Sequence, residues 1–550
     1  MAINELTLPV RHKPALRGVP VWPAVTGALV CGAPLIAVMG LAIFGTWTDY
    51  LIHIAQTRLM SYVLNTLVVG GLAALTAGMG GAVAAWCIAR YRFPGCSWLE
   101  WGLALPLAMP AYGAAYAWYD LTQAGGPLGF LPTVNGPIGA GLIFGFTLYP
   151  YVYLLARETF SGQSVDAYEA ARTLGCSPLG AFWRAALPMA RPAIAAGLAL
   201  VIMESLADYG AVVHLGAPTL SVGLMRAWAG EGSTPDAARI ALLLVSITFI
   251  IFAFERQQRA RARMTNPAGH TRPARPVTLG GPKAWLVSAL CALPLVLALI
   301  LPLGRFGWRA LNTHTHTHLI ESAFNSLMLA GLAGLIAAAF GLAAAYALRS
   351  KKPLAVFAAR LAGLGYAVPG AVAAVGVMII LSGVQMGLDG FWHLNTGSPF
   401  PLLLTSGVFA LLFAYLSRFA AAAIGPSESA LSRVTPSLDG AARTLGASPL
   451  DVVRKIHWPL ISSGTILSGL LVFVEVLKEL PATMILRPFN FQTLAITAHN
   501  YASDERLGEA ALPSLCLVLL ALIPMIWIAR TMVARHKTPS GLDNSGRVQS

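Results

Sequence analysis

The segment 169–192 reads EAARTLGCSPLGAFWRAALPMARP and carries its own start and stop signals for helices. Gly175 stands where a left-handed C-terminal cap is expected, and Ser177 is a favourable N-cap. Pro178 suits the first turn of a new helix because its missing N–H would have no partner there. The segment therefore predicts two short helices with a defined break between them.

The same device occurs again in the segment 439–463, DGAARTLGASPLDVVRKIHWPLISS. Residues 441–446 repeat residues 170–175 letter for letter, 271 positions later, and Ser448 and Pro449 repeat the cap. Solenoid repeats recur roughly every 20–50 residues, so a repeat at this distance indicates a duplicated domain.

The composition indicates where these domains reside. Hydrophobic residues make up 56% of the 550 residues and charged residues only 11%, whereas soluble domains carry about 25% charged residues. Apolar runs of roughly 20 residues, the length that crosses a bilayer, recur along the chain. They lie near 21–45, 61–89, 98–120, 137–157, 191–213, 238–254, 284–304, 322–348, 355–384, 400–423, 460–483 and 510–530. We therefore predict an all-α polytopic membrane protein of about 12 transmembrane helices in two tandem six-helix halves.

The predicted organisation has five parts, of which the linker is basic and rich in proline. They are a cytoplasmic tail 1–20, a first half 21–255 with its loop at 158–190, a cytoplasmic linker 256–283, a second half 284–530 with its loop at 424–459, and a cytoplasmic tail 531–550. With both termini in the cytoplasm, most of the 37 Lys and Arg residues fall on the cytoplasmic side, as the positive-inside rule requires. This asymmetry accounts for the net charge of +14 without any nucleic-acid partner.

Further residues recur at matching places in the two halves. Asn65 corresponds to Asn325, and Pro110 in LPLAMPAYG corresponds to Pro369 in GLGYAVPG. Each half has an even number of spans, so both copies enter the membrane in the same orientation. The two prolines are interpreted either as helix kinks, which membrane helices tolerate, or as part of a gate on the translocation path.

Four acidic residues fall inside or at the end of predicted spans. They are Glu204, Asp208, Glu475 and Glu479, and each pair is spaced four residues apart on one helix face. A charged side chain at the membrane centre costs at least ~2.5 kcal/mol, so it normally faces a cavity or a partner. Lining of a path for a hard cation such as ferric iron is one interpretation. The other is that Glu475 or Glu479 pairs with Lys478 or caps a helix.

A tract of alternating Thr and His follows the seventh span. His314, His316 and His318 would project to one side of an extended chain, which suits contact with a metal ion. Short His-rich tracts also occur in loops without a role, and only Glu321 lies near enough in sequence to assist. No other metal site is expected, because the six cysteines are scattered singly.

The repeated pattern EAA---G followed by LP resembles the cytoplasmic loop of ATP-binding-cassette importer permeases. Together with LPLAMPAYGAAYAW, ESLADYGAVV and EVLKELPATMILRPFNFQTLAI, it is similar to the fused permeases of ferric-iron importers. The resemblance implies a type I permease fold in a bacterial inner membrane. It also implies two copies of a cytoplasmic ATPase subunit that hold ATP and Mg, and a periplasmic binding protein that delivers the substrate. The residues expected to form the ATPase-docking helices are Glu169, Ala170, Ala171, Gly175 and Pro178, and Asp439, Ala441, Ala442, Gly446 and Pro449.

One departure concerns the glutamate that opens the pattern. The second copy has Gly440 at that position, with Asp439 just before it. We therefore expect the two docking loops to bind their ATPase subunits unequally. Glu169→Ala should weaken ATPase association more than Asp439→Ala.

The residues also argue against other functions. A DNA-reading helix-turn-helix is disfavoured because each copy is held between two spans, and a purely structural loop leaves the repeated surface residues unexplained. The chain lacks a phosphate-binding GxxxxGK[ST] loop, so it is not expected to be an enzyme or to bind a cofactor itself. Thiamine, polyamine or sulfate are alternative cargoes, and a secondary transporter is the alternative class.

Overall fold

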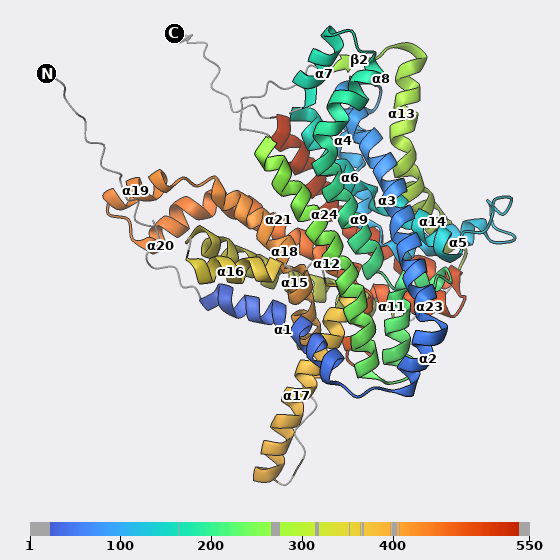
Figure 1. Ribbon diagram of the computed structural model, residues 1–550, viewed down its shortest axis with the longest axis vertical. Coiled ribbons are helices and arrows are strands. Elements are labelled where there is room, and N and C mark those ends of the chain that lie inside the picture. The colour runs from blue at the N-terminus through green and yellow to red at the C-terminus, as the bar shows by residue number, and fades with distance from the viewer. Residues whose placement is uncertain are drawn as a thin grey trace.

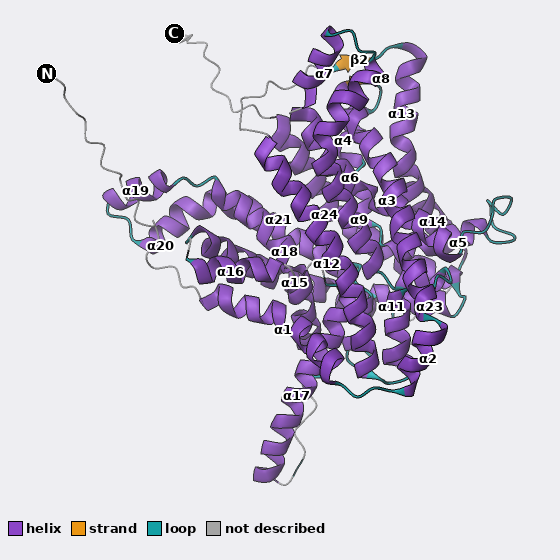
Figure 2. Cartoon of the chain, in the orientation of Figure 1, coloured by secondary structure: helices purple, strands orange, loops and turns teal. Residues whose placement is uncertain are grey.

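The computed structural model describes residues 22–537 apart from 163, 266–275, 314–317, 351, 364, 366–367, 397, 399–403 and 406. These residues are almost entirely helical, and the described part of the chain contains one small sheet, a parallel pair of two-residue strands (Figure 2). The all-α prediction is confirmed.

The first half contains the helices α1 (Trp22–Phe44), α2 (Asp49–Thr57), α3 (Leu59–Arg90), α4 (Cys96–Gly102), α5 (Ala111–Thr122), α6 (Gly136–Gly162), α7 (Ser164–Thr173), α8 (Pro178–Ala181), α9 (Leu187–Ala207), α10 (Gly210–His214), α11 (Leu220–Met225) and α12 (Thr234–Thr265). The second half contains α13 (Gly281–Leu295), α14 (Leu301–Asn312), α15 (Leu319–Arg349), α16 (Pro353–Ala362), α17 (Gly370–Thr396), α18 (Val408–Ser432), α19 (Pro436–Thr444), α20 (Pro449–Asp451), α21 (Trp458–Leu477), α22 (Pro481–Leu486), α23 (Leu494–Ser503) and α24 (Leu507–Lys537). The strands are β1 (Tyr91–Arg92) and β2 (Val277–Thr278).

Eleven helices in the described residues are long and apolar enough to cross a membrane. The prediction of a continuous span at 98–120 is wrong, because this stretch divides into α4, a short turn and α5. The matching stretch of the second half divides into α16 and α17. Pro110 and Pro369 each stand directly before the second piece, since a proline cannot donate the hydrogen bond that a continuous helix needs. Both prolines therefore interrupt a helix rather than kink it.

The contacts of Asn65 and Asn325 confirm that the halves share one internal design. The Asn65 side chain donates to the Pro218 carbonyl, and the Asn325 side chain donates to the Gln492 carbonyl, both at 3.0 Å. The next hydroxyl in each copy, on Thr66 or Ser326, accepts from the backbone N–H two residues beyond that carbonyl. Each half uses these contacts to fix the segment that precedes its last helices.

The halves are interlocked through their first helices. Helix α1 packs against α16 and α17 of the second half, and α13 packs against α3 and α4 of the first. Ser417 on α18 donates to the Cys31 carbonyl at 3.1 Å, and Trp118 on α5 donates to the Leu297 carbonyl at 3.0 Å. The two copies therefore form one body despite the linker between them.

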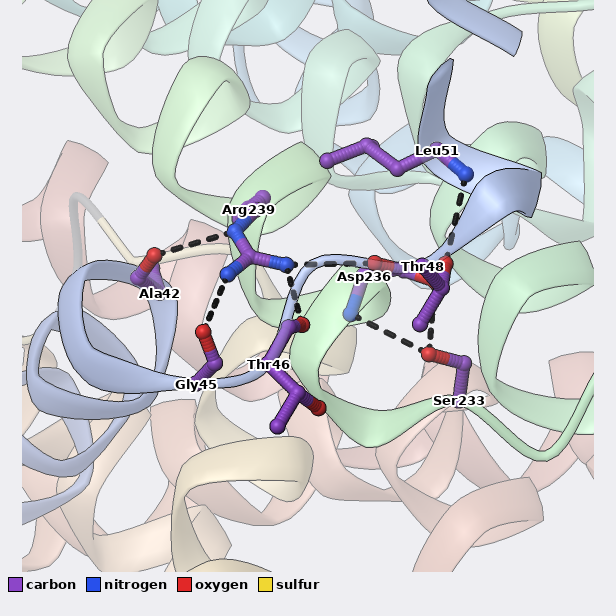
Figure 3. A network of polar contacts seen from close by, with 8 residues as sticks. All are labelled: Ala42, Gly45, Thr46, Thr48, Leu51, Ser233, Asp236 and Arg239. Atoms are coloured by element: carbon purple, nitrogen blue, oxygen red, sulfur yellow. Dashed lines mark hydrogen bonds and ion pairs between the residues drawn. The ribbon is translucent and has the colours of Figure 1, made fainter. Parts of the chain in front are cut away.

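Polar residues fix the far end of α1 in place (Figure 3). Arg239 on α12 donates to the carbonyls of Ala42, Gly45 and Thr46, which end α1 and begin the following turn. Asp236 pairs with the same guanidinium at 3.2 Å and accepts from Ser233. Because these buried charges have partners, we assign them a structural role.

The two halves diverge toward the ends that carry the repeated loops (Figure 1). Helices α7 and α8 lie at the tip of one arm beside β2, and α19 and α20 lie at the tip of the other. The two repeated loops are thus well separated, each at the end of its own arm.

Candidate functional site: two docking loops and a buried charge cluster

The first repeated loop has the predicted caps. Gly175 has a φ of +87°, and the N–H groups of Gly175 and Cys176 donate to the carbonyls of Arg172 and Ala171 at 3.1 Å, the paired bonds of a Schellman cap. Ser177 accepts from the N–H of Gly180 at 3.1 Å, and α8 begins at Pro178. A π-helical turn, Phe182–Ala186, then connects α8 to α9, so that Pro178–Ala207 forms one continuous helix.

The second loop has the same construction. Gly446 has a φ of +82°, and the N–H of Ala447 donates to the Ala442 carbonyl at 3.0 Å. Ser448 accepts from the N–H of Asp451 at 3.2 Å. The predicted helix breaks at Gly175 and Gly446 are both confirmed. They could be predicted because each depends only on residues that are adjacent in the sequence.

Each loop presents large apolar side chains to the surroundings. Leu174 is 84% exposed and its counterpart Leu445 is 88% exposed; Leu179 and its counterpart Leu450 are also exposed. Exposed leucines at identical places in two copies indicate a surface that binds a protein partner. Of the predicted docking residues, Ala170, Gly175, Pro178, Ala441 and Gly446 are exposed, Ala171 is half-buried, Ala442 is buried, and the side chain of Pro449 lies outside the described residues.

The acids that open the two loops each pair with an arginine at the end of a long helix. Glu169 pairs with Arg90 at the end of α3 at 2.5 Å, and Asp439 pairs with Arg349 at the end of α15 at 2.8 Å. Glu169 is half-exposed, but Asp439 is 1% exposed. The prediction that Asp439 contacts an ATPase directly is therefore corrected, because so buried a carboxylate leaves no surface for a partner.

A buried polar network surrounds Asp439. His457 Nε2 lies 2.7 Å from Asp439 Oδ1, and His457 Nδ1 lies 2.9 Å from the hydroxyl of Tyr346. His457 is completely buried. The first loop instead packs Tyr168 and Phe182 against Trp86, with ring centroids 5.2 and 5.0 Å apart. The two docking loops therefore have the same backbone shape. Aromatic packing stabilises the first loop, and a buried hydrogen-bond network stabilises the second.

The burial of Asp439 reverses the expected effect of removing the two acids. Asp439→Ala leaves the Arg349 charge and the His457 ring without their shared partner, whereas Glu169→Ala removes a half-exposed ion pair. Losing one partner of a buried pair costs about 3–5 kcal/mol, and an exposed pair contributes about 0–1 kcal/mol. We expect Asp439→Ala to lose more ATPase in co-purification than Glu169→Ala. Equal retention of ATPase by the two variants would contradict this order.

The four membrane acids lie where two helices break at equivalent places. Glu204 lies near the end of α9 and Asp208 in the turn before α10, while Glu475 lies near the end of α21 and Glu479 in the turn before α22. Asp208 accepts from the N–H of Ala211 at 2.7 Å. Glu479 accepts from the N–H of Ala482 at 3.1 Å and of Thr483 at 3.0 Å. Asp208 and Glu479, each one residue before the N-cap positions Tyr209 and Leu480, thus use their carboxylates to satisfy N–H groups in the first turns of α10 and α22.

Two cations join this cluster, and both come from the second half. Arg418 on α18 lies 3.1 Å from Glu479 and 3.5 Å from Glu204. Lys478 lies 3.0 Å from Glu475. The pairing of Lys478 with Glu475, one of the two alternatives, is confirmed. At the same offset of 271 residues the first half has Thr147 and Ala207 in place of these cations.

Sequence reasoning missed Arg418, although a lone arginine inside an apolar run was a usable signal. The guanidinium links Glu204 of one half to Glu479 of the other. A Cβ on Gly370, the first residue of α17, would come 2.5 Å from Glu479 Oε1. The start of α17 therefore packs directly against the ion pair of Arg418 and Glu479.

The cluster lines a small cavity between the halves, here called the acid cavity. Its volume is about 60 Å³, and all four acids, both cations, Pro110 and Tyr112 line it. Such a volume holds no more than a few water molecules. Four carboxylates face two cations, so the lining carries an excess of negative charge when all the groups are ionised. The structure therefore brings the predicted acids together and adds Pro110 to them.

The histidine tract gains no support as a metal site. His314 and His316 lie outside the described residues, and His318 forms a surface pair with Glu321 at 3.2 Å. Among the described residues, no group of three or more His, Cys, Asp and Glu side chains is placed to hold a metal ion.

Comparison with known proteins identifies a relative of most of the chain and relatives of about a third of it. The family described as "Binding-protein-dependent transport system inner membrane component" matches residues 33–264 and 330–537, which include both loops and all four acids. The chain is 24% identical over 86% of its length, and over 90% of the relative, to the Fe(3+)-transport system permease protein FbpB 2 of Haemophilus influenzae.

A second group of relatives matches about a third of the chain. The chain is 30% identical to the sulfate transport system permease protein CysT of Salmonella typhimurium, over 31% of this chain and 64% of the relative. It is 28% identical to the corresponding Escherichia coli protein over the same shares.

Proposed function

Because the chain belongs to the family of inner-membrane components of binding-protein-dependent transport systems, we propose that it is the fused permease of an ATP-driven importer of ferric iron. It would form the translocation path for a substrate delivered by a periplasmic binding protein. The observation that carries the cargo assignment is the acid cavity, where four carboxylates outnumber two cations between the halves.

The docking loops support two ATPase partners. Each arm ends in a capped helix pair with exposed leucines at matching positions, so each would receive one copy of an ATPase subunit in the cytoplasm. ATP and Mg would be bound by those subunits. Both termini of this chain would lie in the cytoplasm and the binding protein would act at the opposite face of a bacterial inner membrane.

The charge of the acid cavity supports a cationic cargo. Carboxylate oxygens are suitable ligands for hard cations, and when the four carboxyl groups are ionised, the lining attracts cations and repels anions. The relative that matches most of this chain carries ferric iron in its name. Thiamine and polyamines are cations too and remain the cargo alternatives of the same role.

Sulfate is the second candidate cargo. It is favoured by the relatives that match a third of the chain and by the two cations of the acid cavity. Both cations are already paired with carboxylates, however, so an anion entering the cavity would have to displace those partners.

Amide substitution tests whether the acids serve the path. In the complex reconstituted with its ATPase and binding protein, we expect Glu204→Gln with Asp208→Asn to abolish uptake of labelled ferric iron. Stimulation of ATP hydrolysis should persist because the docking loops are unchanged. Asparagine retains the helix cap at position 208, so packing loss is small.

Two further arms complete this test. The Glu475→Gln, Glu479→Gln variant should behave in the same way as the first. Glu100→Gln is the matched control, because Glu100 is also buried and paired with an arginine, Arg157, but does not line the acid cavity. Normal ferric uptake in both double variants, or ATP-dependent uptake of labelled sulfate by the wild type, would overturn the cargo assignment.

A further inference from the structure

A second and larger cavity is lined by residues at or near the ends of α5, α10, α14 and α23. Helices α5, α14 and α23 lie away from both docking loops (Figure 1). This outer cavity has a volume of about 520 Å³, and Tyr119, His214, Arg309 and Ser503 are among its lining residues. In the proposed orientation it faces the binding protein. The outer cavity and the acid cavity share no lining residue.

Tyr116 on α5 stands between the two cavities and contacts both halves of the protein. Its hydroxyl lies 3.0 Å from Nδ1 of His499 on α23. Its ring centroid is 4.6 Å from that of His214, which lines the outer cavity. On its other side, His499 Nε2 lies 3.4 Å from the hydroxyl of Ser503, another residue of the outer cavity.

Tyr112 continues this line toward the acid cavity. It lies one helical turn before Tyr116, with ring centroids 5.7 Å apart, and it lines the acid cavity itself. A row of phenol and imidazole groups therefore connects the two cavities. Its members are Tyr112, Tyr116, His214 and His499, which we call the phenol–imidazole row.

Two atoms of the phenol–imidazole row lack a partner. The hydroxyl of Tyr112, which is 2% exposed, and Nε2 of His214 are buried without a hydrogen bond. Burial of an unpaired polar atom destabilises a fold, and such atoms are rare in native proteins. One such atom lies at each end of the row, so both are placed to interact with something that passes along it.

We propose that the phenol–imidazole row is the constriction of the translocation path between the outer cavity and the acid cavity, and that it contacts a metal cation in transit. Phenol oxygens and imidazole nitrogens carry lone pairs that suit iron. The identity of the cation rests on the proposed function, whereas the route does not.

Cysteine accessibility tests the route without reference to the cargo. Tyr112→Cys and His214→Cys variants of the complex, in right-side-out vesicles, receive a membrane-impermeant maleimide from outside. The wild type gives the background of its six native cysteines. His214→Cys should react at rest, whereas Tyr112→Cys should react only when internal ATP and the binding protein, as purified with whatever solute it carries, sustain turnover.

Tyr149→Cys is the matched control. Tyr149 is a buried tyrosine on α6 whose hydroxyl also lacks a partner, but it lines neither cavity. It should stay unlabelled under all conditions. An unreactive Tyr112→Cys in a complex that turns over ATP, or a Tyr149→Cys that reacts equally fast, would overturn the route.

Transport by conservative variants tests the contact with the cargo. Tyr116→Phe and His499→Gln should each lower uptake of labelled ferric iron about tenfold, the factor expected for one lost contact to a charge. Stimulated ATP hydrolysis should remain, and Tyr149→Phe should transport normally. Wild-type uptake by both variants would refute the contact.

The two proposals fail in distinguishable ways. If Tyr112→Cys is labelled during turnover but the wild type takes up no iron, the cargo assignment fails and the route stands. If the wild type takes up iron but Tyr112→Cys never reacts, the route fails and the cargo assignment stands.

Discussion

Arg418→Met is expected to abolish transport and to lower the stability of the protein more than any other single substitution in the acid cavity. Arg418 pairs there with an acid of each half, Glu204 at 3.5 Å and Glu479 at 3.1 Å. Without it, four carboxylates would face Lys478 alone. Removing one partner of a buried pair costs about 3–5 kcal/mol because the remaining charge is uncompensated.

The measurement is thermal unfolding of the purified protein in detergent, together with uptake in the reconstituted complex. A rescue variant separates charge from packing: Arg418→Met with Glu479→Gln removes both members of one pair and should recover much of the lost thermal stability. Arg157→Met, which breaks the buried pair with Glu100, should destabilise without a rescue by Glu479→Gln. The charge argument fails if the double variant is no more stable than Arg418→Met.

Gly175→Val and Gly446→Val are expected to uncouple ATP hydrolysis from transport while leaving the protein in the membrane. Both glycines have a φ between +80° and +90°, and a Cβ at either position would meet nothing within 4 Å. The Cβ therefore fits without a clash, and the expected effect comes from the positive φ. A left-handed residue other than Gly or Asn costs roughly 1–2 kcal/mol, so the helix after the cap would be displaced from its partner.

Asparagine provides the matched control at both positions, because it tolerates the left-handed conformation. Gly175→Asn and Gly446→Asn should retain ATP-dependent uptake, whereas the valine variants should lose it and co-purify less ATPase. Valine variants that transport as well as the asparagine variants would show that the cap does not aim the docking helix.

The acid cavity shows that pairing or capping by the membrane acids is compatible with the proposed lining of a path. Asp208 and Glu479 cap helices, and Glu475 pairs with Lys478, yet all of them line one cavity. A cap uses part of the hydrogen-bonding capacity of a carboxylate, which has about four acceptor sites. The same group can therefore hold a helix start and still present an oxygen to a cavity.

The sequence by itself determined the features that depend on neighbouring residues. The caps at Gly175 and Gly446 follow from steric preferences of single residues. The spans follow from apolar runs long enough for a bilayer, and the duplication follows from an identical stretch of six residues. The acids were found because an unpaired charge in a span is costly, a cost that any fold must meet.

Only the tertiary structure decided which groups pair with these buried charges. Asp439 is buried because Arg349 and His457 pair with it, while Tyr346 hydrogen-bonds to His457 in turn. Arg418 lies 214 residues from Glu204, and the first helix of each half packs on the other half. Such pairings depend on which helices pack against each other. The periodicity of apolar residues predicts which face of a helix is buried, but it does not predict which helix packs against that face.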